Sequence, residues 1–362
     1  MRIFTLCIIS SILLLGCKKT SQSLKEPEPT PQSTSKANQE NCQKLDQAIQ
    51  KIDDHSSIET LKQVNARLKQ CVPKVKNVQQ LKWLQSSSEM YQRFLQSDTD
   101  QQSATAFGEY TYSILENENN HHTSSIQQGD PKLFKKLGKR DQYLLEHQGQ
   151  AYIEFQHIGE GIFTYRRQPQ YVVDIFASAL PKDQRIFVER MAKDNQDILI
   201  GDAALTISWA ELVDRALFWE NYIKQYPKGQ FTPDARELFA EYTDYIFFGQ
   251  ENTPVSDEYK IGAWFDPDAL KAIKALAKRQ DTQLSIQAQK FLAFIEIPIE
   301  QRQQKFSLPP TKLQNDGNDA LTPSGVAHQQ LRKALNLPAY AWQINSPQNC
   351  HSDAICIALE YD

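Results

Sequence analysis

Apolar residues recur three or four positions apart in two neighbouring runs, which is the spacing of one helix face. The first run is Cys42, Leu45, Ile49 and Ile52, and the second is Ile58, Leu61, Val64, Leu68 and Cys71. Ser56 and Glu59 have the spacing of a capping box at the start of the second run. Residues 41–72 are therefore predicted to form two antiparallel helices joined by a short turn.

Proline marks further helix starts. It follows a capping-type residue four times, at Asp130-Pro131, Thr232-Pro233, Asp266-Pro267 and Thr322-Pro323, and proline is favoured at the first helical position. Ser208 and Glu211 form another capping box, and residues 266–278 and 282–295 have the pattern of a helical pair. We therefore predict a mainly α fold, an irregular or repeat-like bundle of antiparallel helix pairs over residues 41–298, with a small disulfide-stapled C-terminal segment.

The segment AYIEFQHIGEGIFTYR, residues 151–166, fits two patterns. As a helix it places Tyr152, Phe155, Ile158, Ile162 and Tyr165 on one face. As a hairpin it turns at the sequence Gly-Glu-Gly, residues 159–161. We expect the helix, with the two glycines permitting close packing.

The composition changes after Pro298. Residues 299–321 are mostly polar and are expected to be a linker or extended strap. A short helix is predicted near residues 324–336, and the alternating residues Ile355, Ile357 and Leu359 predict an extended segment docked on the body. Residues 322–362 are thus expected to form the small C-terminal segment, which is too short for a separate core.

The N-terminus has one positive charge, at Arg2, followed by a hydrophobic run too short to span a bilayer. The run ends in Leu14-Leu15-Gly16-Cys17, which resembles the lipobox of bacterial lipoproteins. The resemblance implies that residues 1–16 are a signal peptide and that Cys17 becomes acylated, for example by palmitate. Because Lys18 stands where the family's inner-membrane retention signal usually has Asp, the resemblance favours the outer membrane of a Gram-negative bacterium.

The next stretch is predicted to be a disordered tether. Residues 17–40 contain three prolines and almost no apolar side chains. Such a composition cannot bury enough surface to offset the entropy lost on ordering. The membrane is then contacted through the lipid, and the protein is expected in the cell envelope, either in the periplasm or facing the surface.

The charge balance and the number of cysteines limit which partners and which cysteine chemistry are expected. The chain has 40 basic and 44 acidic residues, which argues against a nucleic-acid partner. With Cys7 in the signal peptide and Cys17 acylated, four cysteines remain, an even number that favours disulfides over zinc in an exported protein. A bridge between Cys42 and Cys71 would close the open end of the first helical hairpin, and Cys350 would pair locally with Cys356. We expect no metal site, because neither His351 nor the pair at residues 121–122 has ligand spacing.

The segment YIKQYPKGQFTPDARELF resembles the junction between helices of tetratricopeptide-like repeats in bacterial envelope proteins. The matching residues are Tyr226, Pro227, Gly229, Phe231 and Ala235. The match occurs once, without a 34-residue period, so an ordinary helical hairpin is an equal alternative. The surrounding aromatic residues are expected to be mostly core, and four of them are candidates for a recognition surface: Trp219, Tyr222, Tyr226 and Phe231.

No catalytic motif accompanies these features: the sequence lacks a nucleophile elbow, a P-loop, a dinucleotide fingerprint and an HExxH zinc motif. We therefore expect no cofactor and favour a non-enzymatic scaffold or binding module for another envelope protein or a cell-wall component. The alternative is an envelope hydrolase or related enzyme, with an active site assembled from residues distant in the sequence.

The lipobox yields the first testable prediction. Replacing Cys17 with Ser should abolish labelling of the protein by a palmitate analogue and release it from sedimented membranes, because the acylated thiol would be gone. Cys7→Ser is the matched control and should change neither readout. A Cys17→Ser variant that still labels and sediments with membranes would contradict the lipoprotein prediction.

Overall fold

The computed structural model describes residues 42–97, 100–120, 129–308, 323–338 and 348–358. For residues 117–120 it describes the backbone only. Cys42 begins one compact unit, which is described here by itself. The predicted signal peptide, the tether and Cys17 lie outside the described residues. Among the residues described, no helix is both long and apolar enough to cross a membrane.

The predicted mainly α fold is confirmed. The longer helices are α3 (Ile58–Cys71), α4 (Asn77–Phe94), α5 (Gln101–Asn120), α9 (Lys182–Asp194), α10 (Trp209–Gln225), α11 (Thr232–Phe248), α12 (Pro267–Leu276), α13 (Gln283–Ile295) and α15 (Pro323–Leu335). The shorter ones are α2 (Leu45–Gln50), α6 (Pro131–Phe134), α7 (Lys139–Glu146), α8 (Gln170–Ile175), α14 (Ile299–Lys305) and the 3₁₀ turns η1 (Val72–Lys74) and η2 (Ala177–Ala179).

The strands of the described residues form four separate antiparallel pairs. They are β1 (Ile153–His157) with β2 (Phe163–Arg167), β3 (Ile200–Gly201) with β4 (Ala204–Leu205), β5 (Gly249–Gln250) with β6 (Thr253–Pro254), and β7 (Gln348–Asn349) with β8 (Ile357–Ala358). In β1 and β2 the register pairs Phe155 with Tyr165.

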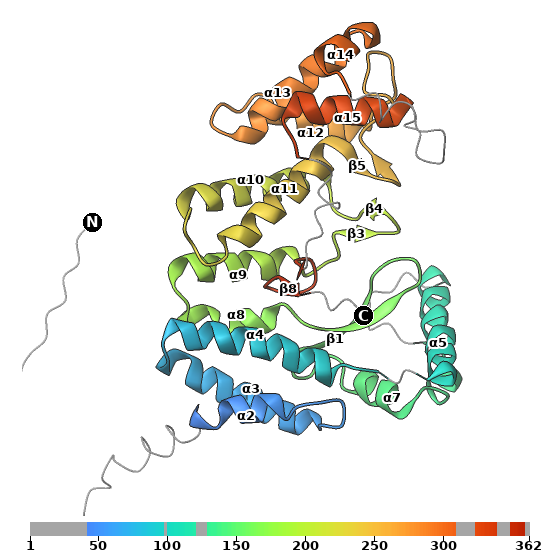
Figure 1. Ribbon diagram of the computed structural model, residues 1–362. Helices are drawn as coiled ribbons and strands as arrows, with labels where there is room; N and C mark the ends of the chain where they lie inside the picture. The colour runs from blue at the N-terminus through green and yellow to red at the C-terminus, as the bar shows by residue number, and fades with distance from the viewer. Residues whose placement is uncertain (1–41, 98–99, 121–128, 309–322, 339–347, 359–362) are drawn as a thin grey trace, which may run out of the picture. The chain divides into compact units, whose positions relative to one another are not determined.

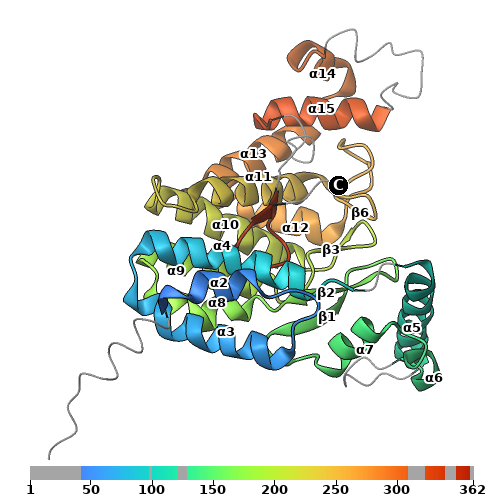
Figure 2. The ribbon, with the colours of Figure 1, turned by 60° about the horizontal axis from the view of Figure 1, so that its bottom comes forward.

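Most of the helices stack in chain order, from α2 and α3 to α13 and α15 (Figure 1). The first three hairpins follow one another along one side of this stack, as both views show (Figures 1 and 2). Neighbouring hairpins are joined by hydrogen bonds: the Leu205 amide donates to Thr253 Oγ1 over 2.9 Å, and the Asn252 amide donates to the Ala203 carbonyl over 2.9 Å. The hairpins that connect the helices are thus linked to one another along one side of the stack.

Aromatic side chains join α9, α10 and α11. The Phe187 ring of α9 stacks on Phe231 with 4.6 Å between centroids and lies 5.1 Å from Trp219 of α10. Phe187 and Trp219 are fully buried. An aromatic ring removes a large apolar area from water, so these contacts account for the close packing of the three helices.

The expected helix at residues 151–166 is wrong, because the segment forms the β1–β2 hairpin. Its turn contains Gly159, Glu160 and Gly161 at φ angles of 100°, 52° and 74°, which a helix does not allow and glycine adopts at little cost. On one face, Phe155 and Phe163 pack with Tyr110 of α5 and Leu137. Apolar and polar residues also alternate along each strand, with Ile153 and Phe155 in β1 and Phe163 and Tyr165 in β2 on one face, which is why periodicity alone did not separate the two structures.

The expected linker at residues 299–321 begins with helix α14, so its first part is corrected. Arg302 within α14 is only 1% exposed. Its guanidinium donates to the carbonyls of Ile297 and Tyr259, over 3.0 and 2.7 Å. The polar composition concealed the helix because a buried arginine, satisfied by backbone carbonyls, takes the place of an apolar residue.

The predicted helix starts are largely confirmed. Asp130, Ser208 and Asp266 each cap a helix by accepting a hydrogen bond from a backbone amide of the first turn. Two positions shift by one residue: Ser57 rather than Ser56 caps α3, and α11 begins at Thr232 itself. Local capping chemistry therefore located these helix starts to within one residue.

Both expected disulfides are present. Cys42 and Cys71 are joined with 5.6 Å between their Cα atoms, across the open end of the α2–α3 hairpin. Cys350 and Cys356 close a loop near the C-terminus. This loop docks on the helical stack and does not form a separate body. Such docking was expected, because the C-terminal segment is too short for a core of its own.

Removing the first bridge should lower stability measurably. In the chain-entropy model, opening the 29-residue separation between Cys42 and Cys71 costs about 3 to 4 kcal/mol of unfolding free energy. The variant Cys42→Ser/Cys71→Ser should show this loss in urea unfolding followed by circular dichroism. The shorter Cys350–Cys356 loop gives a matched comparison with an expected loss of about 2 kcal/mol. Equal stability of the first variant and the parent protein would contradict this account.

Candidate ligand-binding site

A cavity of about 1130 Å³ lies along the edge of β2. All five residues of β2, from Phe163 to Arg167, line it. Because successive side chains of a strand point to opposite faces, a cavity lined by every residue of β2 reaches both faces along its edge. Gln156 and Ile158 of the same hairpin also line it. Its other walls come from the C-terminal part of α4, from residues 198–200 and from the loop closed by Cys350 and Cys356.

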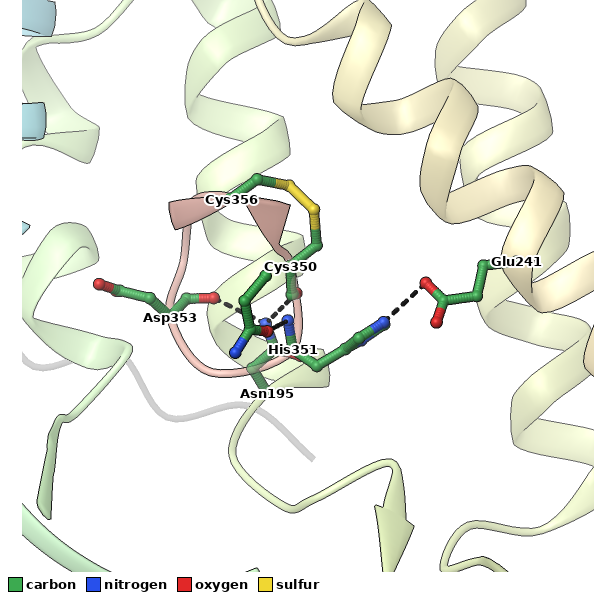
Figure 3. The surroundings of a disulfide bond; sticks show 7 residues. Asn195, Glu241, Cys350, His351, Asp353 and Cys356 are labelled. Carbon is green, nitrogen blue, oxygen red and sulfur yellow. Dashed lines mark hydrogen bonds and ion pairs between the residues drawn. A yellow bond between two sulfur atoms is a disulfide. The ribbon is translucent and has the colours of Figure 1, made fainter. Parts of the chain in front are cut away.

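The C-terminal disulfide loop is held by polar contacts from two helices (Figure 3). The Asn195 side-chain amide, just after α9, donates to the carbonyls of Cys350 and Asp353 over 2.8 and 2.6 Å. His351 Nε2 lies 2.7 Å from Glu241 Oε2 of α11. The disulfide shortens the loop so that these backbone carbonyls and the imidazole face their partners together.

Glu241 is held ionised by these contacts. Burial raises the pKa of this carboxyl, but the charge of His351 and hydrogen bonds from His351 and Tyr245 outweigh burial, so the pKa is lowered below its usual value. The Tyr245 hydroxyl donates to Glu241 Oε1 over 2.6 Å. The ionised carboxylate therefore holds the disulfide loop in place through His351.

A buried ion pair ties the loop to β2. Arg167 Nη2 and Nε lie 2.5 and 3.1 Å from Asp353 Oδ2, and both side chains are 3% exposed. Arg167 Nη1 donates to Ser87 Oγ of α4 over 2.8 Å, and the guanidinium lies 4.4 Å from the centre of the Tyr171 ring. One arginine thus connects α4, β2, α8 and the C-terminal loop.

The neighbouring arginine is also fully engaged. Arg166 Nε donates to Glu154 Oε2 over 2.6 Å, and Arg166 Nη2 donates to the Gln196 carbonyl over 2.9 Å. A longer contact of 3.4 Å joins Arg166 Nη1 to the Ser352 carbonyl. Both arginines of the cavity wall therefore form ion pairs with carboxylates of the protein itself.

The rest of the lining is uncharged for the most part. Phe107, Phe163 and Tyr165 provide aromatic surface, and Ile158 at the end of the hairpin is 39% exposed. Side-chain amides come from Gln92, Gln96 and Gln156, and within the described residues none of the three makes a hydrogen bond. The cavity therefore offers apolar surface together with free amide donors and acceptors.

A second cavity, of about 550 Å³, follows the opposite edge of the hairpin. It is lined by Glu154, His157, Asp197 and Glu211 among others. Glu154 is paired with Arg166, and Glu211 lies 2.5 Å from Arg215. Among the residues described, no three His, Cys, Asp or Glu side chains are grouped so that they could hold a metal ion.

The aromatic residues predicted for a recognition surface occupy the core instead. Trp219 and Tyr222 are 0% and 2% exposed, and Tyr226 and Phe231 are partly buried against the same core. The structure does bring the four together, but as packing between α9, α10 and α11. The cavity residues were missed, and the only sequence signal for them was the alternation on either side of the glycine turn.

The chain matches no protein-family model, and neither the curated proteins nor the solved structures contain a significant match. The chemistry of the cavity is therefore the guide to function. Paired charges, aromatic rings and free amides suit non-covalent binding of an uncharged segment better than proton transfer.

The buried ion pair yields a stability prediction. Asp353→Ala should lower the free energy of unfolding by about 3 to 5 kcal/mol, because the Arg167 guanidinium would remain buried without its counter-charge. Urea unfolding followed by tryptophan fluorescence measures this loss.

Two controls accompany that variant. The double variant Arg167→Met/Asp353→Leu should recover part of the loss, since neither charge remains. Asp214→Ala removes a carboxylate that is 65% exposed and paired with Arg190, and it should cost less than about 1 kcal/mol. A loss of that small size in Asp353→Ala would mean that the pair does not hold the loop.

Proposed function

We propose that this protein is a bacterial envelope lipoprotein, anchored by lipid at Cys17, whose helical body binds another envelope protein or a cell-wall component. The lipobox at residues 14–17 supports the anchor, and Lys18 supports delivery to the outer membrane. The cavity along β2 is the ligand site of this binding module.

The observation that carries this proposal is the pairing of charges around the cavity. Arg166, Arg167 and Asp353 all make ion pairs within the protein. A general acid or base must instead exchange a proton with its substrate. The arrangement therefore supports binding over the alternative of an envelope hydrolase.

Site-specific photocrosslinking in cells tests the proposal. Benzoylphenylalanine placed at Gln92 or Gln96, which both line the cavity and are exposed, should capture the ligand. The adducts would be identified by mass spectrometry as protein or glycan. Capture is expected at both positions because each lines the cavity and is exposed.

Val78 provides the matched control. It lies in α4, is 81% exposed and does not line the cavity, so the same probe there should give no corresponding adduct. Identical adducts at Val78 and Gln92, or none at either cavity position, would contradict the assignment of this cavity as the ligand site.

A further inference from the structure

The hydrogen bonds of the hairpin alternate along β2. The Ile158 amide donates to the Ile162 carbonyl, and the Gln168 amide donates to the Tyr152 carbonyl. In an antiparallel pair such bonded positions recur every second residue, so Thr164 and Arg166 also face β1. The backbone groups of Phe163, Tyr165 and Arg167 therefore point away from β1, toward the cavity.

No strand in the described part of the chain pairs with this outer edge of β2. Within the described residues, the amides of Phe163 and Tyr165 have no hydrogen-bond acceptor. The Tyr165 carbonyl receives only a long contact of 3.4 Å from the hydroxyl of Thr164. Exposed strand edges are normally covered or interrupted because they pair with other chains, and here the edge borders a cavity large enough for a ligand.

We propose that an extended peptide segment of a partner protein binds in this cavity as a third strand, paired with the outer edge of β2. The proposal rests on the proposed function and names the class of ligand. Outward amides and carbonyls at every second residue match the repeat of another extended peptide backbone. A glycan lacks that regular alternation of donors and acceptors.

The surrounding side chains determine which peptides fit. Gln92 and Gln96 line the same cavity, so their side-chain amides are available to bond the added peptide. The two arginines of β2 are paired with Glu154 and Asp353, so the strand itself has no free charge to pair with a charged side chain. The one other charged residue of the described lining, Asp54, lies 3.2 Å from Nδ1 of its neighbour His55. The peptide is therefore extended and uncharged over the roughly five residues that face β2.

Hydrogen exchange of the free protein, followed by NMR, provides the first test. The amides of Thr164 and Arg166 should be protected, whereas those of Phe163 and Tyr165 should exchange at least tenfold faster. Equal protection of all four amides would mean that the edge is already covered, and would overturn the proposal.

Binding is tested with a synthetic library of uncharged linear heptapeptides. The tightest binder should slow exchange at Phe163 and Tyr165 at least tenfold and leave Phe155, on the outer edge of β1, unchanged. It should also compete with capture by the photocrosslinker at Gln92. A library in which no peptide binds more tightly than about 1 mM would overturn the proposal.

Backbone substitution tests the pairing itself. N-methylation of successive peptide residues should weaken binding tenfold or more at every second position and change it less than threefold between them. In the protein, replacing Tyr165 with its α-hydroxy acid puts an ester oxygen in place of the amide N–H and also weakens the preceding carbonyl as an acceptor. This change should weaken binding severalfold, whereas the same replacement at Phe155, which alters the same groups in β1, should not. An N-methylation profile without this period, or equal effects at both protein positions, would overturn strand addition.

Failure of strand addition can be distinguished from failure of the proposed function. If photocrosslinking at Gln92 captures a ligand while the amides of Phe163 and Tyr165 stay unprotected in its presence, the cavity binds that ligand in another way. If neither cavity position captures anything, the binding function itself is lost.

Discussion

The buried pair between Arg167 and Asp353 is the interaction on which the arrangement of the site depends. The two residues are 186 positions apart, and each is almost completely removed from water. An unpaired charge in such surroundings is costly, so the hairpin and the C-terminal loop are stable together in this geometry. The bond from Arg167 to Ser87 adds α4 to the same junction, and these three elements enclose the cavity.

The helical stack provides the frame for this junction. Each helix pair buries its apolar face against its neighbours, and the aromatic contacts of Phe187 join α9 to α10 and α11. A second buried network joins α9 to α10, where Asp194 of α9 lies 2.8 Å from Arg190 and 3.7 Å from Arg215 of α10. Asn195 and Glu241, which hold the disulfide loop, project from this frame. The position of the loop is thus set by helices that have no other part in the cavity.

The ion pairs that build the walls of the cavity also determine its character. Arg166 and Arg167 bring two positive charges to the edge of β2, but Glu154 and Asp353 neutralise them. What remains accessible is mostly aromatic and aliphatic surface, side-chain amides and the backbone of a strand edge, together with the carboxylate of Asp54. Recognition by such a site depends on shape and backbone hydrogen bonds more than on charge.

The sequence by itself determined the mainly α fold, most of the helix starts and both disulfide pairs. Capping by Asp130, Ser208 and Asp266 is local, and so is the helical spacing that places Cys42 beside Cys71, so neither needed knowledge of distant contacts. The lipobox remains a prediction from sequence. Only the tertiary structure decided that residues 151–166 form a hairpin, since their periodicity fits both structures and packing against Tyr110 and Leu137 selects one. It likewise placed Trp219 in the core and assembled the cavity, because burial and pairing across 186 positions leave no pattern in the order of residues along the chain.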